Sequence, residues 1–206
     1  GLFNLNSNNT TATLLASGMV DKVGQLSSTI THNSMKFPPV EIPSHEEAIE
    51  KVIALLTSEE SGSINNVNEV DVIGHRVVHG GTDFSSPVLC TTPTIEQIDS
   101  WSILAPLHNP PAVLGLKLGR KFFPESKHVA VFDTAFHSTI PKVNHRYAIP
   151  KEIYESNPLI RKFGFHGTSY LYTTGKTADY LNLPKPNLIS FHLGSGSSMC
   201  CVKDGK

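Results

Sequence analysis

Two valine-rich runs alternate with segments of helical spacing, and this alternation limits the fold more than any other feature of the chain. Val70–Val78 and His128–Phe132 are bounded by turn residues, as strands are. Between these runs, Thr92-Pro93 and Asn109-Pro110 each begin a segment whose apolar residues recur at helical spacing, and proline is tolerated in the first turn of a helix. Strands that alternate with helices in this way predict an α/β fold.

The N-terminal part of the chain is typical of strands followed by one helix. Residues 1–31 have the composition of β-strands, broken by an Asn/Thr turn between Asn6 and Thr11, and Thr13–Val20 is the best of the expected strands. Ser44 stands three residues before a glutamate, which is the spacing of a capping box. The apolar positions that follow predict a helix to about Ser58.

The C-terminal part is expected to hold a helix and a hairpin. Ser169–Leu181 has helical spacing, and Asn187–His192 and Ser198–Lys203 are expected strands around a glycine turn. Asp204-Gly205 is then a hairpin-type turn signal with no strand after it, and the chain opens at Gly1 without an initiator methionine. A domain that stops at a turn leaves an unpaired edge strand, so we expect the chain to be part of a larger protein.

Composition argues against several classes of protein. The 17 basic and 18 acidic residues nearly balance and neither sign clusters, which argues against a nucleic-acid partner. No apolar stretch reaches the roughly 18 residues of a membrane span, and no signal-peptide pattern opens the chain. The three cysteines, Cys90, Cys200 and Cys201, form no disulfide framework and fit a reducing compartment, so we expect a cytoplasmic protein.

Charged side chains stand at the ends of both valine-rich runs. Arg76 lies near Gly80-Gly81, where the planar fork of an arginine can bind two oxygens of a carboxylate or phosphate; a salt-bridged surface arginine is the alternative. Asp133 directly follows the second run, a position that often holds Mg²⁺ through water, with a capping or turn aspartate as the alternative. Ligands of open α/β sheets bind at the carboxyl ends of strands, so both residues are candidate site residues. His75 and His79 share a strand face, but no complete zinc ligand set accompanies them.

Two histidines precede expected helices, where free backbone N–H groups favour anions. His108 comes just before Asn109-Pro110, and His166 comes before Gly167, which lets an anion approach the backbone closely. Each histidine could donate a hydrogen bond to a phosphoryl group, or could simply pack at the start of its helix. The glycine/serine turn at 194–198 could lay backbone N–H groups along phosphate oxygens, although it lacks the lysine of a P-loop.

Six segments, in order, resemble the acetate and propionate kinase family of the actin, sugar-kinase and heat-shock-chaperone superfamily. They are Gly74–Gly81, Leu104–Pro110, Val129–His137, Tyr147–Pro150, Arg161–Ser169 and His192–Ser198. The resemblance covers nearly the whole chain. It implies an actin-like ATPase fold, related to ribonuclease H, with an N-terminal acyl-binding domain in residues 1–183 that lacks its first strand. Residues 184–206 would be the first hairpin of a truncated C-terminal nucleotide-binding domain.

The resemblance implies the reaction ATP + acetate ⇌ ADP + acetyl phosphate, by direct in-line transfer with Mg²⁺, in a homodimer. Three residues would be catalytic. Arg76 would bind oxygens of acetate or acetyl phosphate, and His166 would contact the transferring phosphoryl group. Asp133 would help to position the nucleophile and Mg²⁺, whose main ligands would lie outside this chain. The isolated chain would then be inactive.

The same resemblance implies the remaining contacts of the site. The small acid would be bound by Arg76, Val78, Leu107, His108 and Phe165, and the phosphates of the nucleotide by His192, Gly194, Ser195 and Gly196. Two residues depart from the family pattern. Ser195 stands where the family usually has asparagine, and Tyr170 stands where it usually has histidine.

Three alternatives remain compatible with the sequence. The chain could be a truncated, non-catalytic product that acts as a binding or dimerisation module. It could serve propionate or butyrate instead of acetate, since one methylene in an apolar pocket changes binding by only about 1–3 kcal/mol. It could also use pyrophosphate in place of ATP, as one lineage of the family does.

Overall fold

The structure, a computed structural model, describes residues 1–6 and 11–206. The chain forms two compact units: residues 1–71 with 118–126, and residues 72–117 with 127–206. The expected division at residue 183 stays a prediction. Most of the turn predicted between Asn6 and Thr11 lies outside the described residues, although the Asn6 N–H donates to the Thr11 carbonyl across it at 3.1 Å.

The first unit confirms the predicted strands at the N-terminus. β1 (Leu2–Leu5) pairs antiparallel with β2 (Ala12–Ala16). β3 (Gly18–Asp21), β4 (Thr29–His32) and β5 (Met35–Lys36) form a separate antiparallel sheet in that order. The described residues before α1 therefore form short antiparallel strands joined by turns and loops.

The prediction of one strand over Thr13–Val20 was wrong, because the chain breaks at Ser17 and enters a second sheet. Asn33 holds this break: its side-chain oxygen accepts the Ser17 N–H at 2.9 Å, and its own N–H donates to the Ser17 carbonyl at 2.7 Å. At the next position, a β-carbon on Gly18 would lie 2.3 Å from the Thr31 carbonyl oxygen. Close backbone contact thus requires glycine where the second strand begins.

The helix predicted after Ser44 is confirmed as α1 (His45–Leu56). The Ser44 side chain accepts the Glu47 N–H at 3.2 Å, as an N-cap does, and donates to the Glu47 carboxylate at 3.3 Å. The buried residues of this unit's core are Ile30, Ile42 and Ala48. A 3₁₀ turn, Val67–Glu69, precedes the second unit.

The second unit is built on a mixed sheet that confirms both valine-rich strands. β6 (Val72–Val77) pairs in parallel with β8 (Lys127–Phe132), and the short β7 (Val88–Leu89) pairs antiparallel with the other edge of β8. Val77 stands opposite Phe132, so the two parallel strands end at the same level. The residues that follow them therefore meet at one edge of the sheet.

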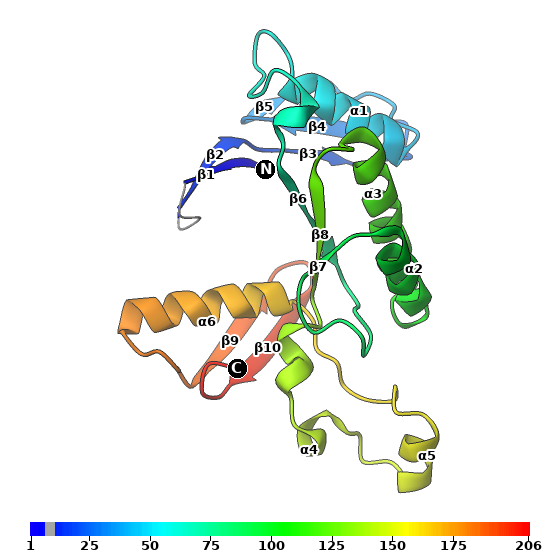
Figure 1. The fold of residues 1–206 in the computed structure, drawn as a ribbon, viewed down its shortest axis with the longest axis vertical. Coiled ribbons are helices and arrows are strands. Elements are labelled where there is room, and N and C mark those ends of the chain that lie inside the picture. The colour runs from blue at the N-terminus through cyan, green and yellow to red at the C-terminus, as the bar shows by residue number, and fades with distance from the viewer. Residues whose placement is uncertain (7–10) are drawn as a thin grey trace. The chain divides into compact units, whose positions relative to one another are not determined.

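Helices cover one face of this sheet, as Figure 1 shows for α2 and α3. α2 (Thr92–Ser100) begins at the predicted Thr-Pro and is followed by a 3₁₀ helix over Trp101–Leu104. α3 (Asn109–Phe122) begins at the predicted Asn-Pro. The helices and the sheet enclose a core of Val77, Phe84, Cys90, Ile95, Ile98, Val113, Leu116, Ala130 and Phe132.

The last helix packs on the predicted hairpin (Figure 1). α6 (Gly167–Leu181) lies against β9 (Leu188–Leu193), which pairs antiparallel with β10 (Ser197–Val202). Between β8 and α6 the chain forms three short helices, Phe136–Thr139, α4 (Lys142–His145) and α5 (Lys151–Ser156). Asp204 and Gly205 have φ angles of 53° and 78°, the left-handed backbone expected of a hairpin turn.

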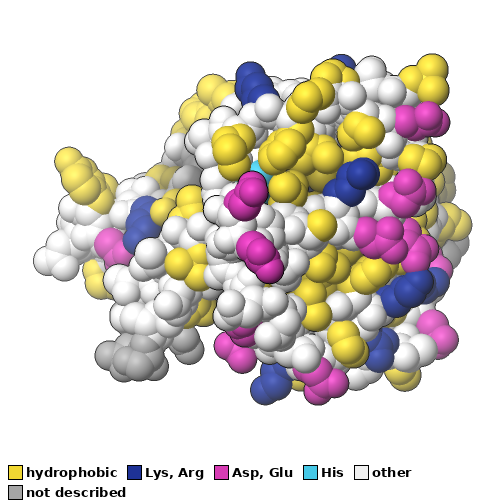
Figure 2. All heavy atoms as spheres, turned by 90° about the horizontal axis from the view of Figure 1, so that it is seen from above, with side chains coloured by type: hydrophobic (Ala, Val, Ile, Leu, Met, Phe, Trp, Pro, Cys, Tyr) yellow, Lys and Arg dark blue, Asp and Glu magenta, His cyan; other side chains and the backbone are white. Residues whose placement is uncertain are grey.

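The face drawn in Figure 2 carries lysine, arginine, aspartate and glutamate side chains interspersed among hydrophobic ones. In the described part of the chain, every helix is too short or too polar to cross a membrane. The absence of a nucleic-acid partner stays a prediction.

Candidate active site

Arg76 and Asp133 form an ion pair at the edge where the parallel strands end. The Arg76 Nε lies 3.1 Å and 3.2 Å from the two carboxylate oxygens of Asp133, and Nη2 lies 2.7 Å from Oδ2. The Asp133 side chain is 2% exposed, whereas that of Arg76 is 65% exposed. The carboxylate therefore anchors one side of the guanidinium fork and leaves the rest of it open to solvent.

The alternation of strand side chains explains why these two residues meet. Val77 and Phe132 point into the core, so their neighbours point to the opposite face of the sheet. Arg76 and Asp133 lie on that face, one strand apart. The hydrogen bonds that Arg76 donates to Asp133 raise the pKa of the Arg76 guanidinium, so the arginine stays charged at physiological pH.

The loop after β6 is held by Asn109, the first residue of α3. Its side-chain oxygen accepts the His79 N–H at 3.0 Å, and its amide nitrogen donates to the His79 carbonyl at 2.9 Å. The next amide, that of Gly80, donates to the Thr134 hydroxyl at 3.1 Å. Asn109 is fully buried, so this two-way clamp fixes the backbone directly after Arg76.

The start of α6 is joined to the end of β8. The Gly167 N–H donates to the Asp133 carbonyl at 2.9 Å, and a β-carbon on Gly167 would lie 2.3 Å from that oxygen. His166, the residue before the helix, has φ of 56°, a left-handed backbone that only a few side chains tolerate. The docked helix thus sets where the His166 side chain lies relative to Asp133.

A second tie fixes the segment before His166. Gly164 has φ of 84°, and a β-carbon there would lie 2.4 Å from the His137 ring. The His137 Nε2–H donates to the Phe165 carbonyl at 2.9 Å, because a carbonyl oxygen can only accept. Burial lowers the pKa of His137, so this histidine is a neutral structural donor.

His166 and His192 stack on each other beside the glycine turn between β9 and β10. Their ring centroids lie 4.1 Å apart with the planes at 19°. The Nδ1 of His166 bonds to the Ser198 hydroxyl at 2.7 Å, and the Nδ1 of His192 bonds to the Ser169 hydroxyl at 3.0 Å. Both rings therefore use Nδ1 for the protein and keep Nε2 for another partner.

The Nε2 atoms of both rings face the glycine turn. A β-carbon on Gly196 would lie 3.4 Å from the His166 Nε2, and one on Gly194 would lie 4.0 Å from the His192 Nε2. Burial, and then the neighbouring His192, lower the pKa of His166, so its ring is neutral near pH 7. A neutral imidazole can still donate one hydrogen bond to an anion.

The structure brings together only some of the predicted site residues. It joins Arg76 to Asp133, and His166 to His192 and the glycine turn. In contrast, Leu107 is 83% exposed and Phe165 is 43% exposed. Among the described interactions, no hydrogen bond, ion pair or ring contact joins the side chains of His108, Val78 or Ser195 to the ion pair or to the stacked histidines. Their roles stay predictions.

The described residues do not by themselves make up a metal site. Asp133 supplies one carboxylate, and both of its oxygens already accept hydrogen bonds from Arg76. His75 bonds to His128 at 3.0 Å, and the His79 Nδ1 accepts the Gly81 N–H, so the two do not converge on a zinc ion. Within residues 1–6 and 11–206, no three His, Cys, Asp or Glu side chains could hold an ion.

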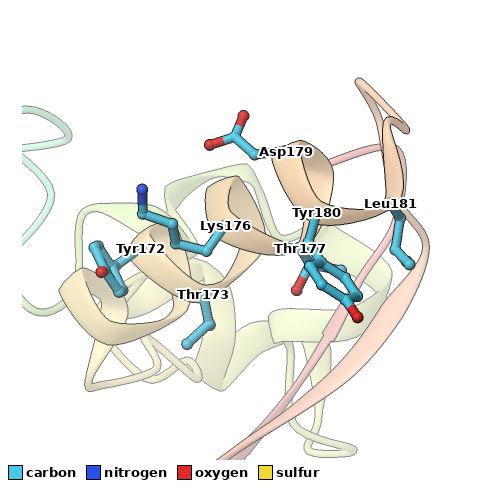
Figure 3. A pocket seen from close by; sticks show the side chains of 7 residues that line it. All are labelled: Tyr172, Thr173, Lys176, Thr177, Asp179, Tyr180 and Leu181. Atoms are coloured by element: carbon cyan, nitrogen blue, oxygen red, sulfur yellow. The ribbon is translucent and has the colours of Figure 1, made fainter. Parts of the chain in front are cut away.

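A hollow of about 730 Å³ lies elsewhere in the second unit, on α6. Figure 3 shows the side chains that line it, which all belong to this helix: Tyr172, Thr173, Lys176, Thr177, Asp179, Tyr180 and Leu181. Tyr180 is 89% exposed and Tyr172 is 65% exposed. A hollow with walls from one helix cannot enclose a small ligand, so it does not compete with the ion pair and the stacked histidines as the candidate site.

Comparison with known proteins identifies the family. The family model described as the acetokinase family matches residues 2–206. The chain belongs to the acetokinase family. It is 46% identical over 199 residues to acetate kinase of Bacillus subtilis strain 168, and 43% identical over 202 residues to acetate kinase of Desulfitobacterium hafniense strain DCB-2. The alignments cover 94% and 95% of the chain and 50% of each relative, so the chain spans about half the length of these curated acetokinases.

Solved acetokinase structures share the fold. The crystal structure of Porphyromonas gingivalis acetate kinase matches 98% of the chain with a TM-score of 0.86 and 35% identity. That of a Francisella tularensis propionate kinase matches 99% with the same TM-score and identity. The chain covers 51% and 52% of these two proteins. These matches confirm the resemblance and the α/β, actin-like fold class, with the chain as its N-terminal portion.

Three polar residues of the site were missed by the sequence analysis. Asn109 was read only as a helix start, and its clamp on the preceding loop depends on packing. The Ser198 hydroxyl lies 2.7 Å from the His166 Nδ1, and the Tyr170 hydroxyl lies 2.5 Å from the Ser198 hydroxyl. The departure of Tyr170 from the family pattern was the one sequence signal for this network.

Proposed function

We propose that the chain forms the acyl- and phosphoryl-binding part of an acetate kinase, which makes acetyl phosphate and ADP from acetate and ATP in a reversible reaction. One observation carries the proposal: the open guanidinium of Arg76, anchored by buried Asp133, lies in the same unit as two stacked histidines whose Nε2 atoms have no hydrogen-bond partner among the described interactions. Phosphoryl transfer needs positioning and charge neutralisation more than covalent chemistry.

Arg76 binds the oxygens of the small acid in this proposal. Its Nη1 has no partner among the described interactions, and Nη2 bonds to Asp133 through only one oxygen contact. The remaining donors can therefore reach a carboxylate or an acyl phosphate in a fork geometry. Asp133 acts on the reaction by holding the arginine in place.

His166 and His192 donate to the transferring phosphoryl group. Their Nε2 atoms face the turn of Gly194, Ser195 and Gly196, where glycine leaves room for phosphate oxygens near the backbone. Donors that are already fixed stabilise charge as it develops, without reorganising during the reaction. The same turn would contact the phosphates of the nucleotide.

The choice of acid depends on an apolar pocket that we assign to Val78, Leu107 and Phe165, with His108 beside it. The match to a propionate kinase structure at 35% identity favours propionate as the second candidate acid. One additional methylene changes binding by only about 1–3 kcal/mol, so related acids should compete measurably. Butyrate, which is one methylene longer than propionate, is the third candidate acid.

The wider setting of the reaction is also proposed. ATP and ADP are the proposed nucleotides, with pyrophosphate as the alternative donor. Mg²⁺ stays a prediction, because the described residues supply only one carboxylate to the candidate site, that of Asp133, and it is already bonded to Arg76. The three free cysteines fit a reducing compartment such as the cytoplasm, and a homodimer is the proposed assembly.

The proposal is tested with protein expressed from its complete coding sequence. The acyl phosphate product is trapped with hydroxylamine as its hydroxamate while acetate, propionate or butyrate is supplied, with ATP or pyrophosphate as donor. We expect ATP- and acetate-dependent product, and a fall of roughly 10²–10³-fold in kcat/KM in Arg76→Ala. Arg76→Lys should not restore activity, because an ammonium cannot make the fork contact. Folded protein without acid-dependent product would favour the non-catalytic alternative.

A further inference from the structure

The His166 ring is hydrogen-bonded to a chain of two hydroxyl groups. The Ser198 hydroxyl lies 2.7 Å from the His166 Nδ1 and 2.5 Å from the Tyr170 hydroxyl. The three groups come from the residue before α6, from β10 and from the first turn of α6. Tyr170 is 1% exposed, so its hydroxyl is held away from bulk water.

We propose that Tyr170 and Ser198 are positioning residues that hold His166 in the tautomer with its proton on Nε2. The proposal deepens the function proposed above and rests on it for its catalytic meaning. The assignment itself comes from the hydrogen-bond geometry, by following where each proton of the network can go.

Only one arrangement of the network gives every proton an acceptor among the described interactions. If Ser198 accepted from both the His166 Nδ1–H and the Tyr170 hydroxyl, its own proton would be the one without an acceptor among them. If Tyr170 donates to Ser198, the Ser198 proton can be donated to Nδ1 of His166, which must then be unprotonated. The reverse direction would begin with an Nδ1–H on His166 that donates to Ser198, and Ser198 would donate to Tyr170. The phenol proton would then need a further acceptor, and the described interactions provide none for the Tyr170 hydroxyl besides Ser198.

Burial makes the direction in which Tyr170 donates to Ser198 more stable than the reverse direction. A buried hydroxyl proton without an acceptor loses its hydration and gains nothing in return. Such a loss biases an equilibrium by roughly tenfold or more. The favoured direction runs from Tyr170 through Ser198 to His166, which leaves the proton of the neutral ring on Nε2.

The tautomer decides what His166 presents to a ligand. An Nε2–H directed at the glycine turn donates to a phosphoryl oxygen, whereas the other tautomer would present a lone pair that repels an anion. His192 repeats the arrangement in a simpler form, because its Nδ1 bonds to the Ser169 hydroxyl. In both histidines a serine hydroxyl thus holds Nδ1, and Nε2 is left to donate to a ligand.

The tautomer is measured directly by ¹⁵N NMR of the protein labelled at its histidines, near pH 7.5. Protonated and unprotonated imidazole nitrogens resonate far apart, and His166→Asn assigns the signals. The variants are Ser198→Ala, Ser198→Thr and Tyr170→Phe, with Tyr172→Phe as the matched control. Tyr172 lies on the same helix and is 65% exposed.

We expect the wild-type His166 to show one tautomer, with Nδ1 unprotonated. Ser198→Ala should lower the ratio of the Nε2–H to the Nδ1–H form by roughly tenfold, and Tyr170→Phe should shift it in the same direction. Ser198→Thr, which keeps the hydroxyl, and Tyr172→Phe should stay within about twofold of wild type. If Ser198→Ala does not fold, Tyr170→Phe carries the test.

Two results would overturn the proposal that Tyr170 and Ser198 set the tautomer of His166. One is an Nδ1–H or mixed tautomer in the wild type, and the other is an unchanged ratio of the two tautomers in both Ser198→Ala and Tyr170→Phe. The measurement needs no turnover. An Nε2–H tautomer in a protein that forms no acetyl phosphate would uphold the positioning role of Tyr170 and Ser198 and reject the proposed function. Failure of the positioning role can therefore be told apart from failure of the proposed function.

Discussion

In the candidate site, neighbouring side chains hold each hydrogen-bond donor in one orientation. Arg76 has Nε and Nη2 on Asp133, so the guanidinium keeps one orientation while its outer edge stays open. His166 and His192 each have one ring nitrogen on a serine hydroxyl. Donors fixed in this way favour the transition state over the bound substrate. Their loss should therefore appear mainly in turnover.

Substitution of His166 tests this at the residue scale. Asn is the chosen replacement because it tolerates the left-handed backbone at this position, where φ is 56°. We expect His166→Asn to lower kcat by roughly 10²-fold, with the KM for acetate changed by less than about threefold. The measurement is steady-state kinetics on the complete protein, with His166→Ala as the second variant. A raised acetate KM with unchanged kcat would assign His166 to acid binding instead.

At the scale of elements, the site depends on how α6 is docked to the end of β8. Gly167 makes this contact, because its N–H donates to the Asp133 carbonyl and its missing side chain allows the approach. The carboxylate that holds Arg76 thus belongs to the same residue that receives the helix. Displacing α6 should disturb both the ion pair and the position of His166.

Two glycines of α6 give a matched pair of variants. Gly167→Ala would place a β-carbon 2.3 Å from a backbone oxygen, so we expect a loss of about 1–3 kcal/mol in the free energy of unfolding. Gly175→Ala meets nothing within 4 Å and should stabilise the helix by about 0.5–1 kcal/mol. Urea denaturation measures both. Equal effects of the two variants would contradict the docking role of Gly167.

Acid should lower the free energy of unfolding through His75, which lies on β6 of the sheet. Burial, and then the neighbouring His128, lower the pKa of His75 to about 4 from 6.5. Between these pH values the unfolded chain binds a proton that the folded chain does not, so stability falls as the pH falls. The expected loss is roughly 1–2 kcal/mol, after allowance for solvent screening at this partly exposed side chain.

His75→Val tests that expectation by urea denaturation between pH 7.5 and 4. The variant should show a shallower fall in stability with acid than the wild type. Ile73→Val on the same strand face is the control, since it removes a methylene without removing a titrating group. We expect it to lower stability by a similar amount at every pH. The same pH slope in His75→Val and wild type would rule out His75 as the acid-sensitive group.

Local signals explain which elements the sequence could predict. Ser44 and Asn109-Pro110 mark helix starts by their own chemistry, and both helices begin there. The contact between Arg76 and Asp133 joins residues 57 apart, and only the register of β6 and β8 brings them together. The bond between Ser198 and His166 depends on how α6 packs on the hairpin, for which no local pattern exists. The break at Ser17 was missed because Asn33 causes it from a distance.

At the scale of the whole molecule, the chain spans about half the length of its curated relatives, yet all of the joined site residues lie in one of its two compact units. The site that we propose for Arg76, Asp133, His166 and His192 would therefore take its geometry from one unit. We expect this unit to bind the acyl phosphate by itself. Turnover of nucleotide is a property we assign to the complete protein.

The most direct test of the account is a titration of the histidine-labelled protein with acetyl phosphate, followed by ¹⁵N NMR. We expect the Nε2 signals of His166 and His192 to move together and to saturate, and Arg76→Ala to weaken the affinity by at least about tenfold. Signals that stay in place, or that move equally in Arg76→Ala, would contradict an anion site built from this arginine and these two histidines.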